Sequence, residues 1–286
     1  MDVRTPPPYL YKDSTAKPKS KPMRHAVRER MLRNLPTVQL QDAPLHAITE
    51  EQTIQIVMDE LDAGRDGCIV TMNLDHMRRY GSDKGYRDLC RQATLHVADG
   101  MPLIWASRVQ GTPLPERVTG SNLIWSLTKS AAENGRSIFL LGGEEGTADD
   151  AAQILKEKHP ELEIAGTYFP PIGFEKNPQQ MNNLVNAIVD ASPDIVYVAL
   201  GSPKQDKLIE HLRGKLPAVW WLGVGISFSF VSGDVSRAPG WMQRYGLEWL
   251  HRLFQEPRRL ATRYLVHGLP FFTRLMTSAI MQRAGL

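Results

Sequence analysis

The chain has 286 residues, of which 42% are hydrophobic and 23% charged, and its formal net charge is +3. This composition is typical of a globular protein with one sizeable core. Two cysteines, Cys68 and Cys90, are too few for a disulfide framework and fit a reducing compartment. No run of about 18 apolar residues occurs, and no apolar region follows the basic start, so we expect neither a membrane-spanning helix nor a secretory signal peptide.

The first segment, residues 1–36, is rich in proline and lysine and has little periodic apolar pattern. It carries nine Lys and Arg residues against three Asp and Glu residues. We expect it to be a disordered basic extension. Residues 241–286 are also basic, with seven arginines against two glutamates, so anionic partners are expected at both ends of the chain.

The body alternates short β-branched runs with longer amphipathic ones. The β-branched runs predict strands at 68–72, 95–98, 137–142, 162–168, 194–200 and 218–223. The amphipathic runs include helices predicted at 48–64, 119–135, 147–159, 178–191 and 203–214. This alternation predicts an α/β fold, a Rossmann-like and mostly parallel sheet with helices on both faces, formed by one domain over 37–236. Residues 237–286 are expected to form a helical appendage.

Polar or glycine-rich residues follow four of the predicted strands. Thr71 and Asn73 end the first strand, Asp99 ends the second, and the runs 142–146 (GGEEG) and 201–205 (GSPKQ) follow the third and fifth. Ligands of parallel sheets bind beyond the carboxyl ends of the strands, so these residues are expected to meet in one crevice.

Each motif has a plainer alternative. Gly142 and Gly143 can bring the backbone close to a nucleotide phosphate, or only form a tight turn before a helix. Gly201, Ser202, Lys204 and Gln205 offer donors to an anionic ligand, or only begin a well-capped helix.

Asp99 precedes a markedly apolar run, HVADGMPLIWASRVQG, in which an ionised carboxylate is costly without a partner or a use. The residues next to Asp99 in the sequence are typical of a turn or of a helix cap at this position. Arg117 lies in a loop before a predicted helix, where it can pair with Asp99, bind a phosphate, or form a surface charge pair.

Six stretches occur in a fixed order: T-x-N at 71–73, ADG at 98–100, ERVTG at 116–120, LLGG at 140–143, GSPKQ at 201–205 and the tail that begins RAPGW at 237. Together they resemble the WecG/TagA/CpsF family of glycosyltransferases, family 26 of the sequence-based classification. The resemblance covers roughly residues 40 to 265.

The resemblance implies an inverting, metal-independent enzyme without a cofactor. Such an enzyme moves a sugar from a UDP-sugar to an undecaprenyl-diphosphate-linked saccharide during the synthesis of exopolysaccharides and other bacterial surface polysaccharides. The family's proposed base falls on Asp99, its active-site threonine on Thr71, its asparagine on Asn73, its pocket arginine on Arg117 and its glutamine on Gln205.

An inverting transfer needs a base that takes the proton of the acceptor hydroxyl, and a partly desolvated carboxylate suits that task. The leaving UDP develops negative charge, which arginines and helix N-termini neutralise. We expect at least one contact to the diphosphate of the donor or acceptor from the tail arginines Arg237, Arg252, Arg258 and Arg259.

Two positions depart from the commoner family pattern. Ser229 stands where many members have an aspartate that contacts the nucleotide, so the residue that recognises the uracil base is not predicted. Met101, Pro102 and Leu103 follow ADG and resemble the subset that includes a xanthan-type glucosyltransferase. The donor is expected to be of the glucose or N-acetylmannosamine type, and the sequence favours a hexose such as glucose.

The tail combines helically spaced apolar residues with many arginines, which is typical of an interfacial helix. We expect residues from about 241 onward to bind an anionic membrane surface, with the enzyme at the cytoplasmic face of the cell membrane. The alternative is that these helices complete the core. A homo-oligomer is left open.

Two other function classes fit parts of the sequence. An NAD(P)-dependent oxidoreductase is disfavoured because the chain lacks the G-x-G-x-x-G spacing and an acidic residue for the ribose. A non-catalytic module that binds anionic lipid is the second. No nucleic-acid partner is expected, because aromatic residues do not alternate with the basic residues of the N-terminal segment.

Overall fold

The computed structural model describes residue 32, residues 34–216 and residues 218–285. The expected disordered extension over 1–36 therefore lies almost wholly outside the described residues.

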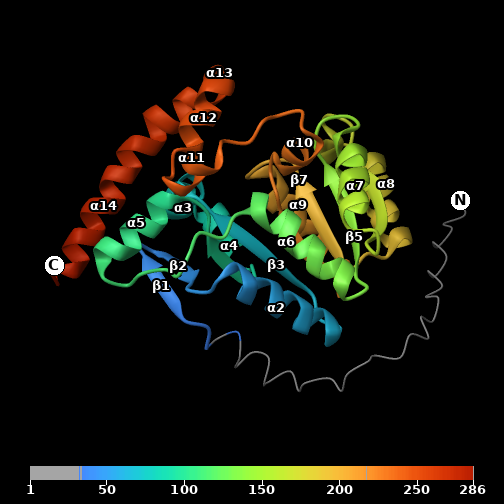
Figure 1. The fold of residues 1–286 in the computed structure, drawn as a ribbon, viewed down its shortest axis with the longest axis horizontal. Helices are drawn as coiled ribbons and strands as arrows, with labels where there is room; N and C mark the ends of the chain where they lie inside the picture. Colours follow the sequence, from blue (N-terminus) through green and yellow to red (C-terminus); the bar gives the residue numbers. More distant parts are fainter. Residues whose placement is uncertain (1–31, 33, 217, 286) are drawn as a thin grey trace, which may run out of the picture.

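A six-stranded parallel sheet forms the centre of the molecule (Figure 1), in the order β4-β3-β8-β7-β5-β6. Its strands are β3 (Gly67–Met72), β4 (Leu95–Ala98), β5 (Ser137–Gly142), β6 (Glu163–Tyr168), β7 (Ile195–Ala199) and β8 (Trp220–Gly223). All six predicted strands are confirmed to within two residues. Every residue of β3, β4, β5, β7 and β8 is buried, whereas the edge strand β6 is only partly buried.

Helices cover both faces of the sheet, as expected. Alternate residues of β5 show this, because Ile138 and Leu140 pack in one core cluster and Phe139 and Leu141 in another. The first face is covered by α2 (Glu50–Asp62), α6 (Gly120–Glu133), α7 (Thr147–Lys158) and α10 (Ser227–Ser232). The second is covered by α3 (Leu74–Ser82), α4 (Lys84–Arg91), α5 (Met101–Gln110), α8 (Pro178–Ala191) and α9 (Lys204–Arg213). A 3-10 turn, η1 (Phe174–Lys176), precedes α8.

The connections create a crevice at the carboxyl end of the sheet. The neighbouring strands β5 and β7 continue into helices on opposite faces, α7 and α9. The loops that leave these strands therefore diverge, and ligands of α/β sheets bind at such a point.

A two-stranded antiparallel hairpin, β1 (Thr37–Leu40) and β2 (Ala43–His46), lies outside the parallel sheet and was not predicted. Its inward residues Val38, Leu40, Ala43 and Leu45 are buried in the same cluster as α5. The hairpin therefore closes the β4 side of the core.

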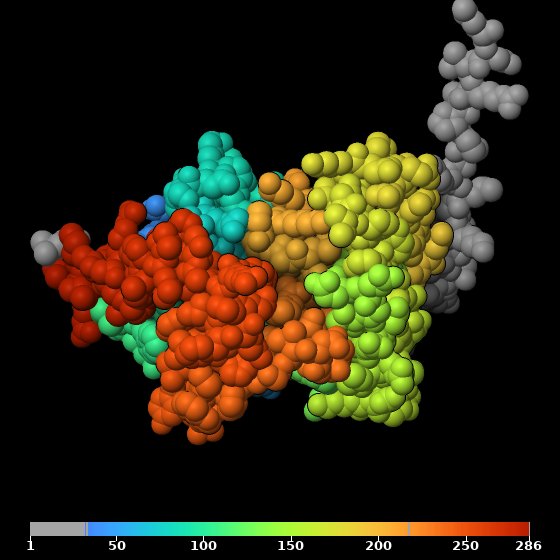
Figure 2. All heavy atoms as spheres, turned by 90° about the horizontal axis from the view of Figure 1, so that it is seen from above, coloured from blue at the N-terminus to red at the C-terminus, as the bar shows by residue number. Residues whose placement is uncertain are grey.

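The tail runs back across the carboxyl end of the sheet to α5. It consists of α11 (Gly240–Arg244), α12 (Glu248–Gln255), α13 (Pro257–Ala261), a π-helix over Thr262–Gly268 and α14 (Leu269–Arg283). Figure 2 shows the tail, in orange and red, covering one side of the face that is seen from above.

The last helix of the tail is part of the core. Phe271, Leu275 and Ala279 of α14 are buried against α5 and the hairpin. A side chain at Gly246 would meet Met101 of α5, since an added Cβ would lie 2.6 Å from the Met101 Cβ. α14 thus completes the core, which was the alternative prediction for the tail. The predicted domain boundary at residue 236 stays a prediction. Within the described part of the chain, no helix is both long and apolar enough to cross a membrane.

Candidate active site

A cavity of about 750 Å³ opens at the carboxyl ends of β3, β4, β5, β7 and β8, with the tail as one wall. Most of the sequence-predicted site residues line it: Thr71, Asn73, Asp99, Arg117, Gly143, Gly201, Ser202, Gln205, Ser229, Arg252 and Arg259. Four do not: Gly142, Lys204, Arg237 and Arg258. The expectation that the strand ends meet in one crevice is confirmed.

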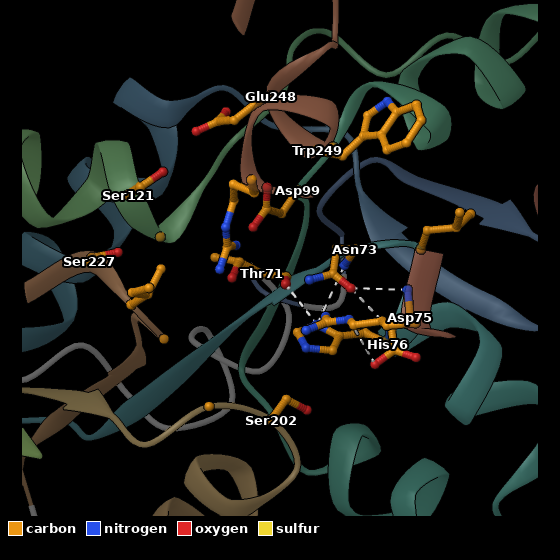
Figure 3. A pocket seen from close by; sticks show the side chains of 18 of the residues that line it. Thr71, Asn73, Asp75, His76, Asp99, Ser121, Ser202, Ser227, Glu248 and Trp249 are labelled. Atoms are coloured by element: carbon orange, nitrogen blue, oxygen red, sulfur yellow. Dashed lines mark hydrogen bonds and ion pairs between the residues drawn. The ribbon is translucent and has the colours of Figure 1, made fainter. Parts of the chain in front are cut away.

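Asp99 lies at the end of β4 and faces the cavity. Its backbone N–H donates to the carbonyl of Met72 at 2.7 Å, which fixes it beside the end of β3. The N-cap of α5 is Gly100, with no side-chain cap, so the reading of Asp99 as a helix cap is wrong. No hydrogen bond or ion pair reaches the Asp99 carboxylate from the described residues, and Figure 3 shows it between Thr71 and Glu248 without a bonded partner.

The surroundings of Asp99 raise its pKa to about 6. Burial in the pocket wall is the main cause, and the charge of Glu248 adds to it. The positive charges of Arg117, Arg252 and Arg237 oppose the rise. A carboxylate with this pKa is ionised at neutral pH and holds a proton more readily than an ordinary aspartate, as a general base should.

Arg117 pairs with a tail carboxylate instead of with Asp99. Its Nη1 lies 3.1 Å from Oε2 of Glu248, and Nε of Arg237 lies 3.2 Å from Oε1 of the same side chain. Arg237 also donates to Oδ1 of Asn122 at 2.8 Å, which holds it behind the cavity wall. Glu248 was missed by the sequence analysis, because 131 residues separate it from Arg117.

Thr71 and Asn73 are held by the start of α3. The Asn73 side chain caps this helix by accepting from the backbone N–H groups of Asp75 and His76 at 3.0 and 3.1 Å. Nδ1 of His76 lies 3.0 Å from the carbonyl oxygen of Thr71 (Figure 3). Burial lowers the pKa of His76. No role was predicted for this histidine, yet it lines the cavity.

The 201–205 loop is built into the fold on both sides. Oε1 of Gln205 accepts from the backbone N–H groups of Gly201 and Gly225 at 3.1 and 3.2 Å, joining the loops that follow β7 and β8. Lys204 turns away from the cavity, 3.4 Å from Glu175.

Gly142 and Ser202 both have contacts that serve the fold. Gly142 adopts φ +94°, and an added Cβ would lie 2.8 Å from the carbonyl oxygen of Ala199, so it serves the close approach of β5 and β7. Ser202 donates to Oδ2 of Asp206, 2.5 Å away, and the Tyr86 hydroxyl donates to the same oxygen at 3.3 Å. This hydroxyl–carboxylate group under the cavity was not predicted.

Three tail arginines line the cavity, of which Arg263 was not predicted. Nε of Arg252 is buried without a hydrogen-bond partner, and Arg263 approaches Asp75 at 3.5 Å. Arg259 pairs with Glu256 at 2.7 Å. Arg258 is exposed on the outside of α13, so the diphosphate contact expected of it has no support in its position.

A sequence model of the Glycosyl transferase WecG/TagA/CpsF family matches residues 38–285. The chain belongs to this family. It is therefore a glycosyltransferase, and the oxidoreductase and the non-catalytic lipid-binding module are set aside. Ser229 of this WecG/TagA/CpsF member is buried in α10 at the cavity wall, where many relatives were expected to carry an aspartate.

Two relatives carry the same name, N-acetylglucosaminyldiphosphoundecaprenol N-acetyl-beta-D-mannosaminyltransferase. The protein of Bacillus spizizenii is 31% identical over 199 residues, which cover 70% of this chain and 75% of the relative. The protein of Bacillus subtilis is 33% identical over 178 residues, which cover 62% of this chain and 67% of the relative.

Proposed function

We propose that this WecG/TagA/CpsF member transfers N-acetylmannosamine, with inversion, from its UDP-sugar to N-acetylglucosamine on a polyprenyl diphosphate. The observation that carries the proposal is the unpaired Asp99 carboxylate, which faces a cavity lined by arginines. The names of the two relatives support this sugar pair. Met101 and Pro102 line the same cavity and make UDP-glucose the competing donor.

The proposed reaction transfers one proton and releases one leaving group. Asp99 takes the proton of the acceptor hydroxyl as its oxygen bonds to the anomeric carbon, on the face opposite UDP. The bond from that carbon to the diphosphate oxygen breaks, and UDP leaves with the electron pair. Arg252 and Arg259 neutralise the developing charge, and Arg117 stands beside Asp99 on the same cavity wall. The Thr71 hydroxyl positions the acceptor.

Transfer is expected without a divalent metal, because the cavity supplies guanidinium groups for the diphosphate. The full chain is incubated with labelled UDP-N-acetylmannosamine or UDP-glucose and N-acetylglucosaminyl-diphospholipid in detergent, with and without EDTA. We expect labelled lipid-linked disaccharide with the first donor at an unchanged rate in EDTA. Loss of transfer in EDTA, restored by Mg²⁺ or Mn²⁺, would contradict metal independence, and transfer from UDP-glucose alone would replace the proposed donor.

We also propose that the tail docks on the anionic inner face of the cell membrane, where a lipid-linked acceptor lies. Tyr245, Phe254 and Val266 are 68%, 76% and 61% exposed, and Leu265 and Leu269, both at the cavity rim, are 50% and 59% exposed. Apolar residues beside arginines suit the headgroup region, where each basic residue contributes about 1 kcal/mol.

Membrane docking predicts that the full-length protein sediments with anionic vesicles at low salt. The double variant Tyr245→Ser and Phe254→Ser should bind them several-fold more weakly, because it removes two exposed rings. Ile172→Ser is the matched control, since Ile172 is 99% exposed on the loop after β6 and lies outside the tail. An equal loss of vesicle binding in the double variant and in Ile172→Ser would overturn this docking surface, and so would a wild type that does not sediment with the vesicles.

A further inference from the structure

Glu248 joins two arginines that come from different parts of the fold. It is the first residue of α12, and its side chain is 16% exposed. One carboxylate oxygen pairs with Arg117, in the loop before α6, and the other pairs with Arg237, in the loop after α10. Nη1 of Arg237 lies 3.4 Å from the Ser121 carbonyl, at the first turn of α6. The tail is thereby tied through one carboxylate to both loops.

The same three charged side chains act on Asp99. Arg117 and Arg237 attract its negative charge, and Glu248 repels it. Arg117 is paired with Glu248 and makes no ion pair with Asp99 in the described structure. Without Glu248, the nearly buried guanidinium of Arg117 would lack a carboxylate partner, and a direct Arg117–Asp99 pair would satisfy it. A carboxylate held by a guanidinium is a weaker base.

Other charged groups line the cavity from neighbouring elements. These are Asp75 and His76 of α3, Glu144 after β5, Arg252 and Glu256 of the α12 segment, and Arg259 and Arg263 further along the tail. Glu256 is engaged by Arg259, and Asp75 by Arg78, Arg79 and Arg263. Among the acidic side chains described here, Glu248 is the one that holds Arg117.

We propose that Glu248 is a positioning residue of the transfer reaction. It holds Arg117 and Arg237 away from the Asp99 carboxylate, so that the base is left unpaired. This inference rests on the proposed function, in which Asp99 is the base. Glu248 itself need not touch either substrate.

Two substitutions separate charge from shape. Glu248→Gln keeps the size of the side chain and removes its charge, whereas Glu248→Asp keeps the charge and shortens the side chain. We measure the pH profile of kcat from pH 5 to 9 for each full-length protein, with circular dichroism as the test of folding. Glu144→Gln is the matched control, because it removes a carboxylate that lines the same cavity but pairs, among the described residues, with none of the arginines that act on Asp99.

In Glu248→Gln, the acid limb of the profile should move down by about one pH unit or more, as expected for a carboxylate that gains a guanidinium partner. The value of kcat at pH 7.5 should fall roughly tenfold, because the paired base is weaker. In Glu248→Asp and in Glu144→Gln, the acid limb should stay at its wild-type position.

An unmoved acid limb in a folded Glu248→Gln protein would overturn the inference. An acid limb that lies closer to the wild-type position in Glu248→Gln than in Glu248→Asp would also overturn it. Unfolding of both Glu248 variants would also overturn it, because Glu248 would then serve stability. Unfolding of Glu248→Gln alone would overturn it as well, because the charge of Glu248 would then serve stability. Failure of the wild type to transfer sugar from any UDP donor would instead contradict the proposed function.

Discussion

Asp99→Asn is expected to lower kcat by roughly 10²–10⁴-fold, the usual effect of losing a general base. The amide keeps the shape of the side chain but cannot take the proton of the acceptor hydroxyl. Binding of UDP should stay within a few-fold of the wild-type affinity, because the arginines that line the cavity are unchanged. Steady-state transfer kinetics and calorimetric titration with UDP measure the two quantities.

The pH dependence of the same variant provides a second measurement. In the wild type, kcat should fall as the pH drops below about 6, the pKa to which burial raises Asp99, because the protonated carboxyl cannot act as a base. This acid limb should be absent from the residual activity of Asp99→Asn. Near-wild-type turnover in the folded variant would remove Asp99 from the mechanism.

Stability should change in the direction opposite to activity. Because the folded-state pKa of Asp99 lies above its ordinary value of 3.8, the contribution of Asp99 to stability is greatest below pH 4 and is lost as the pH rises to about 6. Asp99→Asn removes the charge that burial disfavours. The variant should therefore have a higher midpoint of thermal unfolding than the wild type at pH 7.5 and a similar one below pH 4.

The double variant Arg252→Gln and Arg259→Gln is expected to lower kcat/KM for the UDP-sugar by roughly 10²-fold or more. Each hydrogen bond to a charged group contributes about 1.5–3 kcal/mol, and the leaving diphosphate needs most of this charge in the transition state. Nε of Arg252 is buried without a partner, so it is available to such a ligand.

Arg258→Gln is the matched control for these arginines. It removes one positive charge from the helix that carries Arg259, but Arg258 is exposed outside the cavity. Its kinetics should equal those of the wild type in detergent. Equal losses in Arg258→Gln and in the double variant would show that the tail acts through its overall charge and not through contacts in the cavity.

The parallel sheet could be predicted because its strands are buried on both faces and read as continuous apolar runs. The β1–β2 hairpin could not, since its strands have four residues each and its turn contains no glycine. Gln41 adopts φ +50° there, a conformation that ordinarily favours glycine or asparagine. The paired helices α3 and α4 were missed for another reason, namely that few of their residues are apolar.

The site was predictable wherever the sheet itself gathers residues. Thr71, Asn73 and Asp99 stand at strand ends, and the parallel arrangement alone brings strand ends together. Gln205 lies in the first turn of α9, the helix that follows β7. The pairing of Arg117 with Glu248 was not predictable, because it depends on where the tail returns. The position of His76 in the cavity lining was not predictable either, since its neighbours in the sequence do not distinguish a buried histidine from one on the surface.

The π-helical stretch Thr262–Gly268 sets the rotational phase between two halves of the tail. Upstream of it, Arg252 and Arg259 line the cavity, Arg263 lines it from within the stretch, and downstream of it Leu275 packs into the core. A residue added to or removed from a helix turns everything beyond it by about 100° about the axis. The direction in which these guanidinium groups point therefore depends more on the length of this stretch than on its side chains. Over evolutionary time, the stretch should tolerate substitutions far better than insertions or deletions.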